Sequence, residues 1–152
     1  MTTACKVIAH LQGRTLVTAE SLTGGGIGAA LTAVPGASAV YKGGVISYCD
    51  EVKREVLGVP GEVLETCGAV SARTAGYMAS GARKLLQADI AVAVTGLAGP
   101  GGDEFGHAVG TVFVGFASAQ KSVVKEFRFT GSREEVRQQT VEAALQLILE
   151  NA

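Results

Sequence analysis

The sequence predicts an α/β fold, a single-domain three-layer α/β/α sandwich built around a mixed β-sheet. Short apolar runs typical of buried strands alternate with amphipathic helical segments, in the order α-β-α-β-α-α-α-β-β-β-α. The last two predicted strands, 111–118 and 122–129, are too close in sequence for a parallel crossover, so part of the sheet must be antiparallel. A chain of 152 residues fits one such domain, spanning 1–152, and is long enough to bury about 70% of its unfolded surface.

In the first half of the chain, apolar periodicity predicts the helices and strands, and capping or breaking residues predict their ends. Pro35 and Gly36 close the second helix. Asp50 is expected to cap the third helix, which Gly58 and Pro60 end. The predicted elements of this half are a helix at 3–12, a strand at 15–19, a helix at 24–33, a strand at 44–48 and a helix at 50–57.

The second half contains the most apolar strand and the clearest helix starts. Ser71 is a typical N-cap, and the run from Ser132 to Glu135 matches a capping box, in which the two side chains bond each other's backbone amides. The predicted elements are a helical turn at 61–66, a helix at 71–87, a buried strand at 90–94, strands at 111–118 and 122–129, and a final helix from Ser132.

Composition disfavours nucleic-acid binding and membrane insertion. The 13 basic and 14 acidic residues are spread along the chain and there is no tryptophan, so neither a basic stripe nor an aromatic platform exists. No apolar run approaches the roughly 18 residues of a membrane span, and the first residues do not resemble a signal peptide. Three cysteines without C-x-x-C spacing (Cys5, Cys49 and Cys67) indicate free thiols in a cytoplasmic protein. The apolar surplus favours a homo-oligomer.

Three loops should carry the functional groups. They cover residues 20–26, 48–53 and 95–102, and each follows a predicted strand. In open α/β sheets, ligands bind at the carboxyl ends of the strands. Glycine, at 21 residues about twice its usual share of roughly 7%, is concentrated in and near these loops, where it lets backbone amides approach a ligand.

Ser21, at the junction between a strand and a helix, could be a nucleophile, a phosphate ligand or a helix cap. A nucleophilic serine needs a base. His10 belongs to the first helix and His107 to a loop, and the hydrolase elbow G-x-S-x-G is not met, because Ala19 and Thr23 replace its glycines. The sequence therefore disfavours a Ser-His-Asp triad.

Lys53 is the remaining candidate base. It lies in the first turn of its predicted helix, where the helix dipole and any burial lower the pKa of the amine, while Asp50 and Glu51 raise it. A solvated surface lysine is the alternative. Tyr48, at the end of the preceding strand, could place a phenol between Ser21 and Lys53.

The loop from Thr95 to Gly102 is similar to an amide-lined site for an anion or oxyanion, although a plain turn has the same composition. Arg133 and Arg137 lie four residues apart on one face of the last helix. Arginine suits bidentate binding of phosphate or carboxylate, and a solvated surface pair is the alternative.

A competing motif points to a dinucleotide-binding oxidoreductase. Residues 24–29 satisfy G-x-G-x-x-A after a strand, and Asp50 could serve as the acid that binds ribose. Against this interpretation, the helix after the motif is short, and consecutive helices interrupt the βαβαβ order.

Four separated blocks resemble the CinA C-terminal domain family, over residues 14–150. The family's members include nicotinamide-nucleotide amidases. Leu22 stands where many relatives have cysteine, and the N-terminal molybdopterin-binding-like domain of longer relatives is absent, which implies the stand-alone form. The blocks are Thr18–Gly26, Gly43–Tyr48 with Lys53, Val94–Pro100 and Val109–Val112.

The resemblance implies hydrolysis of the carboxamide of nicotinamide mononucleotide to nicotinate mononucleotide and ammonia, with no metal or cofactor. Ser21 would be the nucleophile, Lys53 its base and Tyr48 part of the proton relay. One glycine loop would hold the oxyanion and the other, with an arginine, the 5′-phosphate; which does which stays open. A non-catalytic nucleotide-binding module is the alternative. The implied substrate-binding residues are Thr23, Gly24, Gly25, Thr95, Gly96 and Arg137.

Overall fold

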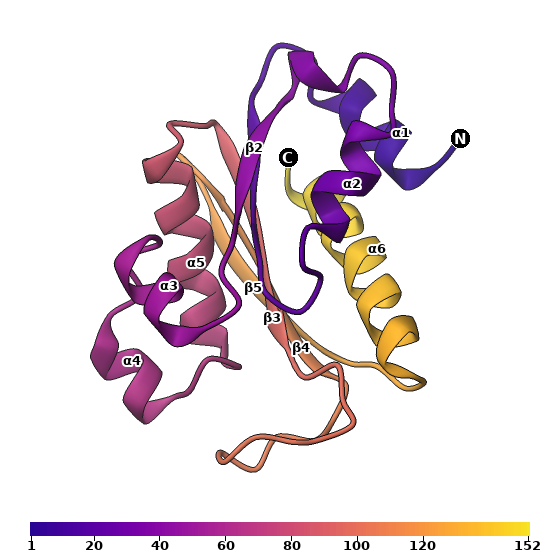
Figure 1. Ribbon diagram of the computed structural model, residues 1–152. Helices are drawn as coiled ribbons and strands as arrows, with labels where there is room; N and C mark the ends of the chain where they lie inside the picture. Colours follow the sequence, from indigo (N-terminus) through magenta and orange to yellow (C-terminus); the bar gives the residue numbers. More distant parts are fainter.

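A five-stranded sheet with strand order β2-β1-β3-β4-β5 separates two layers of helices (Figure 1). The computed structural model describes all 152 residues. The elements are α1 (Thr3–His10), β1 (Leu16–Glu20), α2 (Gly26–Thr32), a 3₁₀ turn (Ala37–Ala39), β2 (Tyr41–Ile46), α3 (Asp50–Glu55), α4 (Gly61–Thr66), α5 (Ala72–Leu85), β3 (Ile90–Gly96), β4 (Thr111–Ser118), β5 (Ser122–Arg128) and α6 (Arg133–Asn151).

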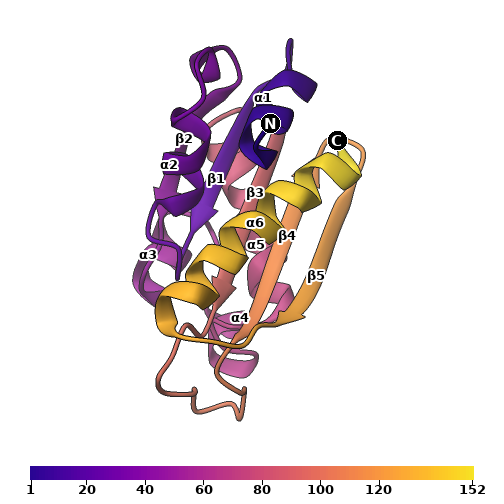
Figure 2. The ribbon, with the colours of Figure 1, turned by 90° about the vertical axis from the view of Figure 1, so that its right-hand side faces the viewer.

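The two helical layers confirm the predicted three-layer sandwich. Helices α1, α2 and α6 cover one face, with α6 packed along β4 and β3, and α3, α4 and α5 cover the other (Figures 1 and 2). Strand β3 is shared between the layers, because its alternate side chains enter two different cores. Ile90, Val92 and Val94 belong to the core beneath α1, α2 and α6, whereas Ala91 and Ala93 belong to the core beneath α5. No helix is long and apolar enough to cross a membrane.

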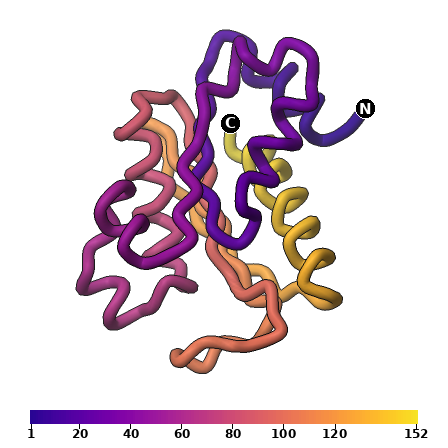
Figure 3. The backbone as a smooth tube through the Cα atoms, in the orientation of Figure 1, coloured from indigo at the N-terminus to yellow at the C-terminus, as the bar shows by residue number.

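The sheet is mixed, as the sequence predicts. Strand β1 pairs in parallel with both β2 and β3, while β3–β4 and β4–β5 are antiparallel. Glu20, the last residue of β1, lies opposite Ile46 of β2 and Val94 of β3. The carboxyl ends of all three parallel strands therefore meet at one edge of the sheet, together with the loops that follow them. The chain termini lie toward the opposite end (Figure 3).

Most element boundaries agree with the sequence within two or three residues, and the predicted caps at Ser71 and Ser132 are present. Strand β2 differs, since it runs over Tyr41–Ile46 rather than 44–48. The predicted strand begins at Gly44, which lies opposite Thr18, and a β-carbon at Gly44 would come within 2.9 Å of the Thr18 carbonyl oxygen. Glycine is thus what lets β2 pair closely with β1.

Asp50 does not cap α3. The N-cap position belongs to Cys49, which makes no capping side-chain bond, and Asp50 is the first helical residue. An aspartate in the first turn is still favourable for the helix dipole.

Candidate active site

Ser21 is the first residue after β1 and remains fixed to the sheet. Its amide donates to the carbonyl of Val94 in β3 at 3.2 Å, and its own carbonyl accepts from the amide of Gly24 at 3.0 Å. These two bonds place the serine at the start of a tight turn, with its hydroxyl largely buried at the carboxyl edge of the sheet.

Lys53 reaches Ser21 directly. The amine Nζ lies 3.1 Å from Ser21 Oγ, and it donates to the carbonyl of Ser47 at 2.6 Å. Only 2% of Lys53 is exposed, so the alternative of a solvated surface lysine is wrong. Burial lowers the pKa of the amine below the ordinary 10.5, and the negative charge of Asp50 opposes part of that shift.

A cavity of about 230 Å³ opens beside this pair. Groups from all three predicted loops line it, together with Arg133 from the start of α6. The lining residues that carry polar groups of interest are Ser21, Tyr48, Lys53, Thr95, Gly96 and Arg133. The structure confirms the prediction that loops 20–26, 48–53 and 95–102 meet, since residues of all three line the same cavity.

Tyr48 does not lie between Ser21 and Lys53. Its side chain is at the mouth of the cavity, 60% exposed, and its hydroxyl accepts from Arg133 Nη2 at 2.8 Å. The expected serine–tyrosine–lysine relay is therefore corrected to a direct serine–lysine contact, with the tyrosine paired to an arginine. Strand β2 ends at Ile46, so Tyr48 belongs to a connecting loop rather than to a strand terminus.

The two arginines of α6 have different surroundings. Arg133 lines the cavity and donates from Nη1 to the carbonyl of Gly99 at 2.6 Å. Arg137 instead donates to the carbonyls of Leu22 at 2.9 Å and Thr23 at 3.3 Å, and it does not line the cavity. Arg137 therefore supports the Ser21 turn from behind, and Arg133 is the cation of the pocket.

The glycine turn after Ser21 is not open to a ligand, because a buried carboxylate occupies it. Glu20 Oε1 accepts from the hydroxyl of Thr23 and from the amides of Gly25 and Ile27, and Oε2 accepts from the amide of Gly28. These are the amides that a dinucleotide phosphate would need. The oxidoreductase interpretation loses its phosphate site for this reason.

The same contacts correct the expected binding roles of three residues. Neither Thr23, Gly24 nor Gly25 lines the cavity. The Thr23 hydroxyl and the Gly25 amide are bonded to Glu20, and the Gly24 amide is bonded to the carbonyl of Ser21. These bonded groups build the turn, and the Thr23 amide is not among them.

Thr95 and Gly96 do line the cavity, at the carboxyl end of β3. The Thr95 hydroxyl donates to the carbonyl of Ala69 at 2.8 Å, which ties β3 to the segment before α5. A β-carbon at Gly96 would lie 2.8 Å from the Thr111 carbonyl oxygen, so only glycine allows β4 this close.

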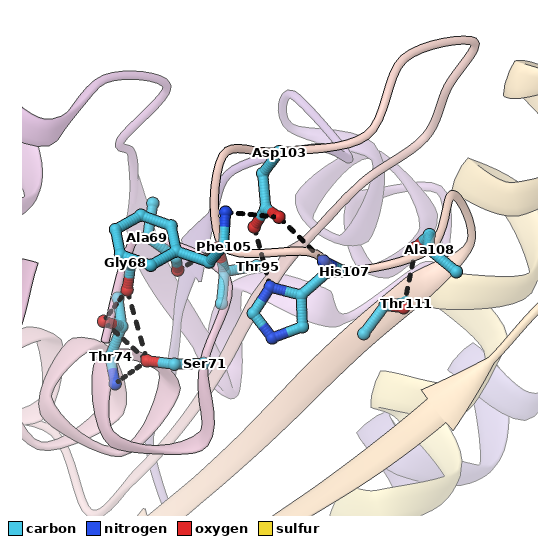
Figure 4. Close-up of polar contacts among 10 residues, drawn as sticks. All are labelled: Gly68, Ala69, Ser71, Thr74, Thr95, Asp103, Phe105, His107, Ala108 and Thr111. Atoms are coloured by element: carbon cyan, nitrogen blue, oxygen red, sulfur yellow. Dashed lines mark hydrogen bonds and ion pairs between the residues drawn. The ribbon is translucent and has the colours of Figure 1, made fainter. Parts of the chain in front are cut away.

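The long β3–β4 loop is held by a residue pair that the sequence did not reveal. Asp103 accepts from the amides of Phe105 and His107 and from Nδ1 of His107 at 2.7 Å (Figure 4). Burial raises the pKa of Asp103, but the bonds and charge of His107 outweigh it, and the pKa is lowered. Phe105 packs against Gly68, where a β-carbon would come within 2.7 Å of its ring. The signal available was the i, i+4 spacing of an acid and a histidine.

A three-layer α/β/α domain with a buried serine–lysine pair at the carboxyl edge of its parallel strands is the scaffold of an enzyme or of a closely related binding domain. Residues 2–152 match the CinA C-terminal domain family. The chain belongs to this family.

Solved structures and curated relatives agree with this assignment. The competence/damage-inducible protein CihA of Agrobacterium tumefaciens has a TM-score of 0.94 at 41% identity, over 97% of this chain and 92% of its own. A CinA superfamily protein of Enterobacter cloacae has a TM-score of 0.94 at 34% identity, over 100% and 94%.

A CinA-like protein of Parasynechococcus marenigrum is 48% identical over 146 residues, which are 93% of this chain and 35% of that protein. The CinA-like protein of Thermosynechococcus vestitus is 47% identical over 135 residues, or 86% of this chain and 32% of its own length. The chain thus spans about a third of the length of the curated relatives that it matches.

Proposed function

We propose that this domain is an amidohydrolase that converts nicotinamide mononucleotide to nicotinate mononucleotide and ammonia. The observation that carries the proposal is the buried contact between Ser21 Oγ and Lys53 Nζ at 3.1 Å, at the wall of a cavity. A hydroxyl becomes a nucleophile when a neighbouring base removes its proton, and burial of Lys53 favours the neutral amine that can do so.

The reaction follows from that pair in two stages. In the first, Ser21 Oγ attacks the carboxamide carbon, its proton passes to Lys53 Nζ, and the carbonyl electron pair moves onto oxygen. When the carbonyl re-forms, the C–N bond breaks and the proton on Lys53 leaves with the nitrogen as ammonia. In the second, water attacks the acyl-serine ester and gives its proton to Lys53, and the proton returns to Ser21 as nicotinate mononucleotide is released.

Arg133 provides the charge expected of a site for a phosphorylated substrate. Two of its five N–H donors are bonded to Gly99 and Tyr48, which leaves the others for an anion at the cavity mouth. The 5′-phosphate would bind there, with the carboxamide held near Ser21. In this arrangement the β3–β4 loop and Arg133 serve the phosphate, and the Ser21 turn serves the oxyanion.

Ammonia release from nicotinamide mononucleotide tests the proposal. Ser21→Ala removes the attacking oxygen and should abolish release, whereas Ser80→Ala, which makes the same change on the exposed side of α5, should leave it unchanged. Measured turnover by the purified Ser21→Ala variant at the wild-type rate would rule out the mechanism. If the substrate raises the melting temperature but no ammonia appears, the site is that of a binding module.

A further inference from the structure

Glu20 is the only carboxylate of the chain that is fully buried, and the mechanism above gives it no task. Only 2% of the residue is exposed, and it precedes Ser21 directly in sequence. Its carboxylate accepts four hydrogen bonds of 2.6 to 3.2 Å, all from groups in the turn after Ser21 and in the first turn of α2. All four partners are donors, which suits a carboxylate because it accepts hydrogen bonds.

Because Glu20 and the turn itself use most of the local amides, the few that remain can be identified. Gly25, Ile27 and Gly28 donate to Glu20, while Gly24 and Gly26 donate to backbone carbonyls. The amides of Leu22 and Thr23 donate to no group of the protein.

Arg137 fixes the direction of one of these free amides. The Leu22 carbonyl points toward Arg137 Nε at 2.9 Å. In a planar trans peptide the N–H points opposite to the C=O, so the Thr23 amide points away from α6. Leu22 itself lines the cavity beside Ser21.

From these contacts we propose that Glu20 is a positioning residue, whose carboxylate holds the Ser21 turn so that the amides of Leu22 and Thr23 receive the developing oxyanion. The proposal rests on the function proposed above, because it takes Ser21 as the nucleophile. It also explains why a carboxylate accepts the hydrogen bonds of the amides at the start of α2. The carboxylate uses the amides of Gly25, Ile27 and Gly28, and it leaves the amides of Leu22 and Thr23 free for the oxyanion.

Glutamate suits this role better than glutamine does. A carboxylate only accepts hydrogen bonds, and all four contacts of Glu20 come from donors. In Glu20→Gln the amide nitrogen must face a donor such as the Gly28 amide, so at least one contact becomes repulsive. The substitution keeps the shape of the side chain and changes the position of the turn.

The test compares Glu20→Gln with the wild type in two assays on the whole chain. The first is turnover of nicotinamide mononucleotide. The second is labelling of Ser21 by a fluorophosphonate, which reacts with activated serines whatever their natural substrate and builds negative charge on its phosphoryl oxygen. We expect kcat and the labelling rate both to fall about tenfold or more, as when an oxyanion donor is lost. KM should stay within about twofold, and the pH midpoint set by Lys53 should not move.

Asp89→Asn is the matched control. Asp89 accepts from the amide and hydroxyl of Thr15, just before the other end of β1, so the same carboxylate-to-amide change is made far from Ser21. Both rates should stay at their wild-type values in this variant. Folded Glu20→Gln with unchanged rates, or with a raised KM at unchanged kcat, would overturn the proposal.

A second pair of variants covers the case in which Glu20→Gln does not fold. Thr23→Val removes one of the four donors to Glu20 at nearly constant shape, and Thr23→Ser restores the hydroxyl. The valine variant should lower kcat and the labelling rate, and the serine variant should recover both; equal rates in the two variants overturn the proposal. A wild type that is labelled at Ser21 but releases no ammonia shows that the substrate is wrong, and labelling still decides the role of Glu20. A wild type that is not labelled and releases no ammonia overturns both proposals.

Discussion

The amine of Lys53 sets the pH dependence expected for the proposed reaction. Its pKa is lowered by burial, so the neutral form is present at lower pH than for a free lysine. We expect kcat/KM to rise with pH and to level off above a midpoint below 10.5. Asp50 opposes the shift, because its negative charge stabilises the protonated amine. Asp50→Asn should therefore move the midpoint to lower pH, which a pH–rate profile would measure. A midpoint that moves upward would contradict this assignment.

Substitution of the two arginines of α6 should distinguish substrate binding from positioning of the Ser21 turn. Arg133→Ala removes the cavity's cation and should raise KM about tenfold or more with little change in kcat, because a charge-assisted hydrogen bond contributes about 1.5–3 kcal/mol. Arg137→Ala removes two bonds to the backbone of the Ser21 turn and should lower kcat instead. It should also lower the free energy of unfolding by about 1–3 kcal/mol. Steady-state kinetics and urea unfolding of both variants test this, and the reverse pattern would exchange the two roles.

The sequence could place Ser21 and Lys53 but not the partners of the other site residues. Ser21 follows one predicted strand and Lys53 lies at the start of the helix after the next, and both positions follow from the chain order alone. Arg133 and Arg137 share a helix face, and only the packing angle of α6 decides which of them meets the cavity. The role of Glu20 was equally hidden, because it depends on how α2 turns back over the end of β1.

At the scale of the elements, close contact between β1 and β2 sets the position of Lys53. β2 leads to Ser47, whose carbonyl binds Lys53 and whose amide donates to the carbonyl of Glu20 at 2.7 Å. Gly44 allows this approach. The sequence predicted a strand from Gly44 and so began it too late, since pattern alone did not show that Tyr41 and Gly43 also pair with β1.

Gly44→Ala should separate β2 from β1. The added methyl group would overlap the Thr18 side chain and approach its carbonyl oxygen, and overpacking of this kind costs about 1–3 kcal/mol of unfolding free energy. Activity should fall with it. In Gly76→Ala, a helical control, the nearest atom is Val124 Cγ2 at 3.6 Å, and the change should stabilise α5 by about 0.5–1 kcal/mol. Chemical denaturation measures the free energy of unfolding of the two variants. Equal values would show that β1 and β2 can adjust to the added methyl group.

At the scale of the whole molecule, one apolar surface has no partner within the chain. The side chains of Val56, Tyr77 and Leu85 are exposed around a shallow hollow between the end of α3 and α5. Exposed apolar clusters of this kind favour association. We predict a homo-oligomer, and Leu85→Glu should shift it toward monomer in light scattering, while the same charge added in Ala39→Glu should not. A monomeric wild type would contradict the prediction.

The sequence predicted the fold class correctly because two layers of helices need a sheet that is apolar on both faces. The apolar run at 90–94 forms the centre of that sheet. Which helices share a layer could not be predicted, because short connections allow either face. That arrangement emerges only from the packing of α6 beside α1 and α2.

The location of the chain ends has a practical consequence. Ala152 lines a hollow with Ile90, the first residue of β3, whereas the last residue of β3, Gly96, lines the cavity beside Ser21. A fusion partner, an affinity handle or a surface linker joined at either terminus would thus project from the end of the domain that lies opposite the cavity beside Ser21 (Figure 3). Tethering the protein to a bead or sensor by its termini should leave small molecules free access to that cavity.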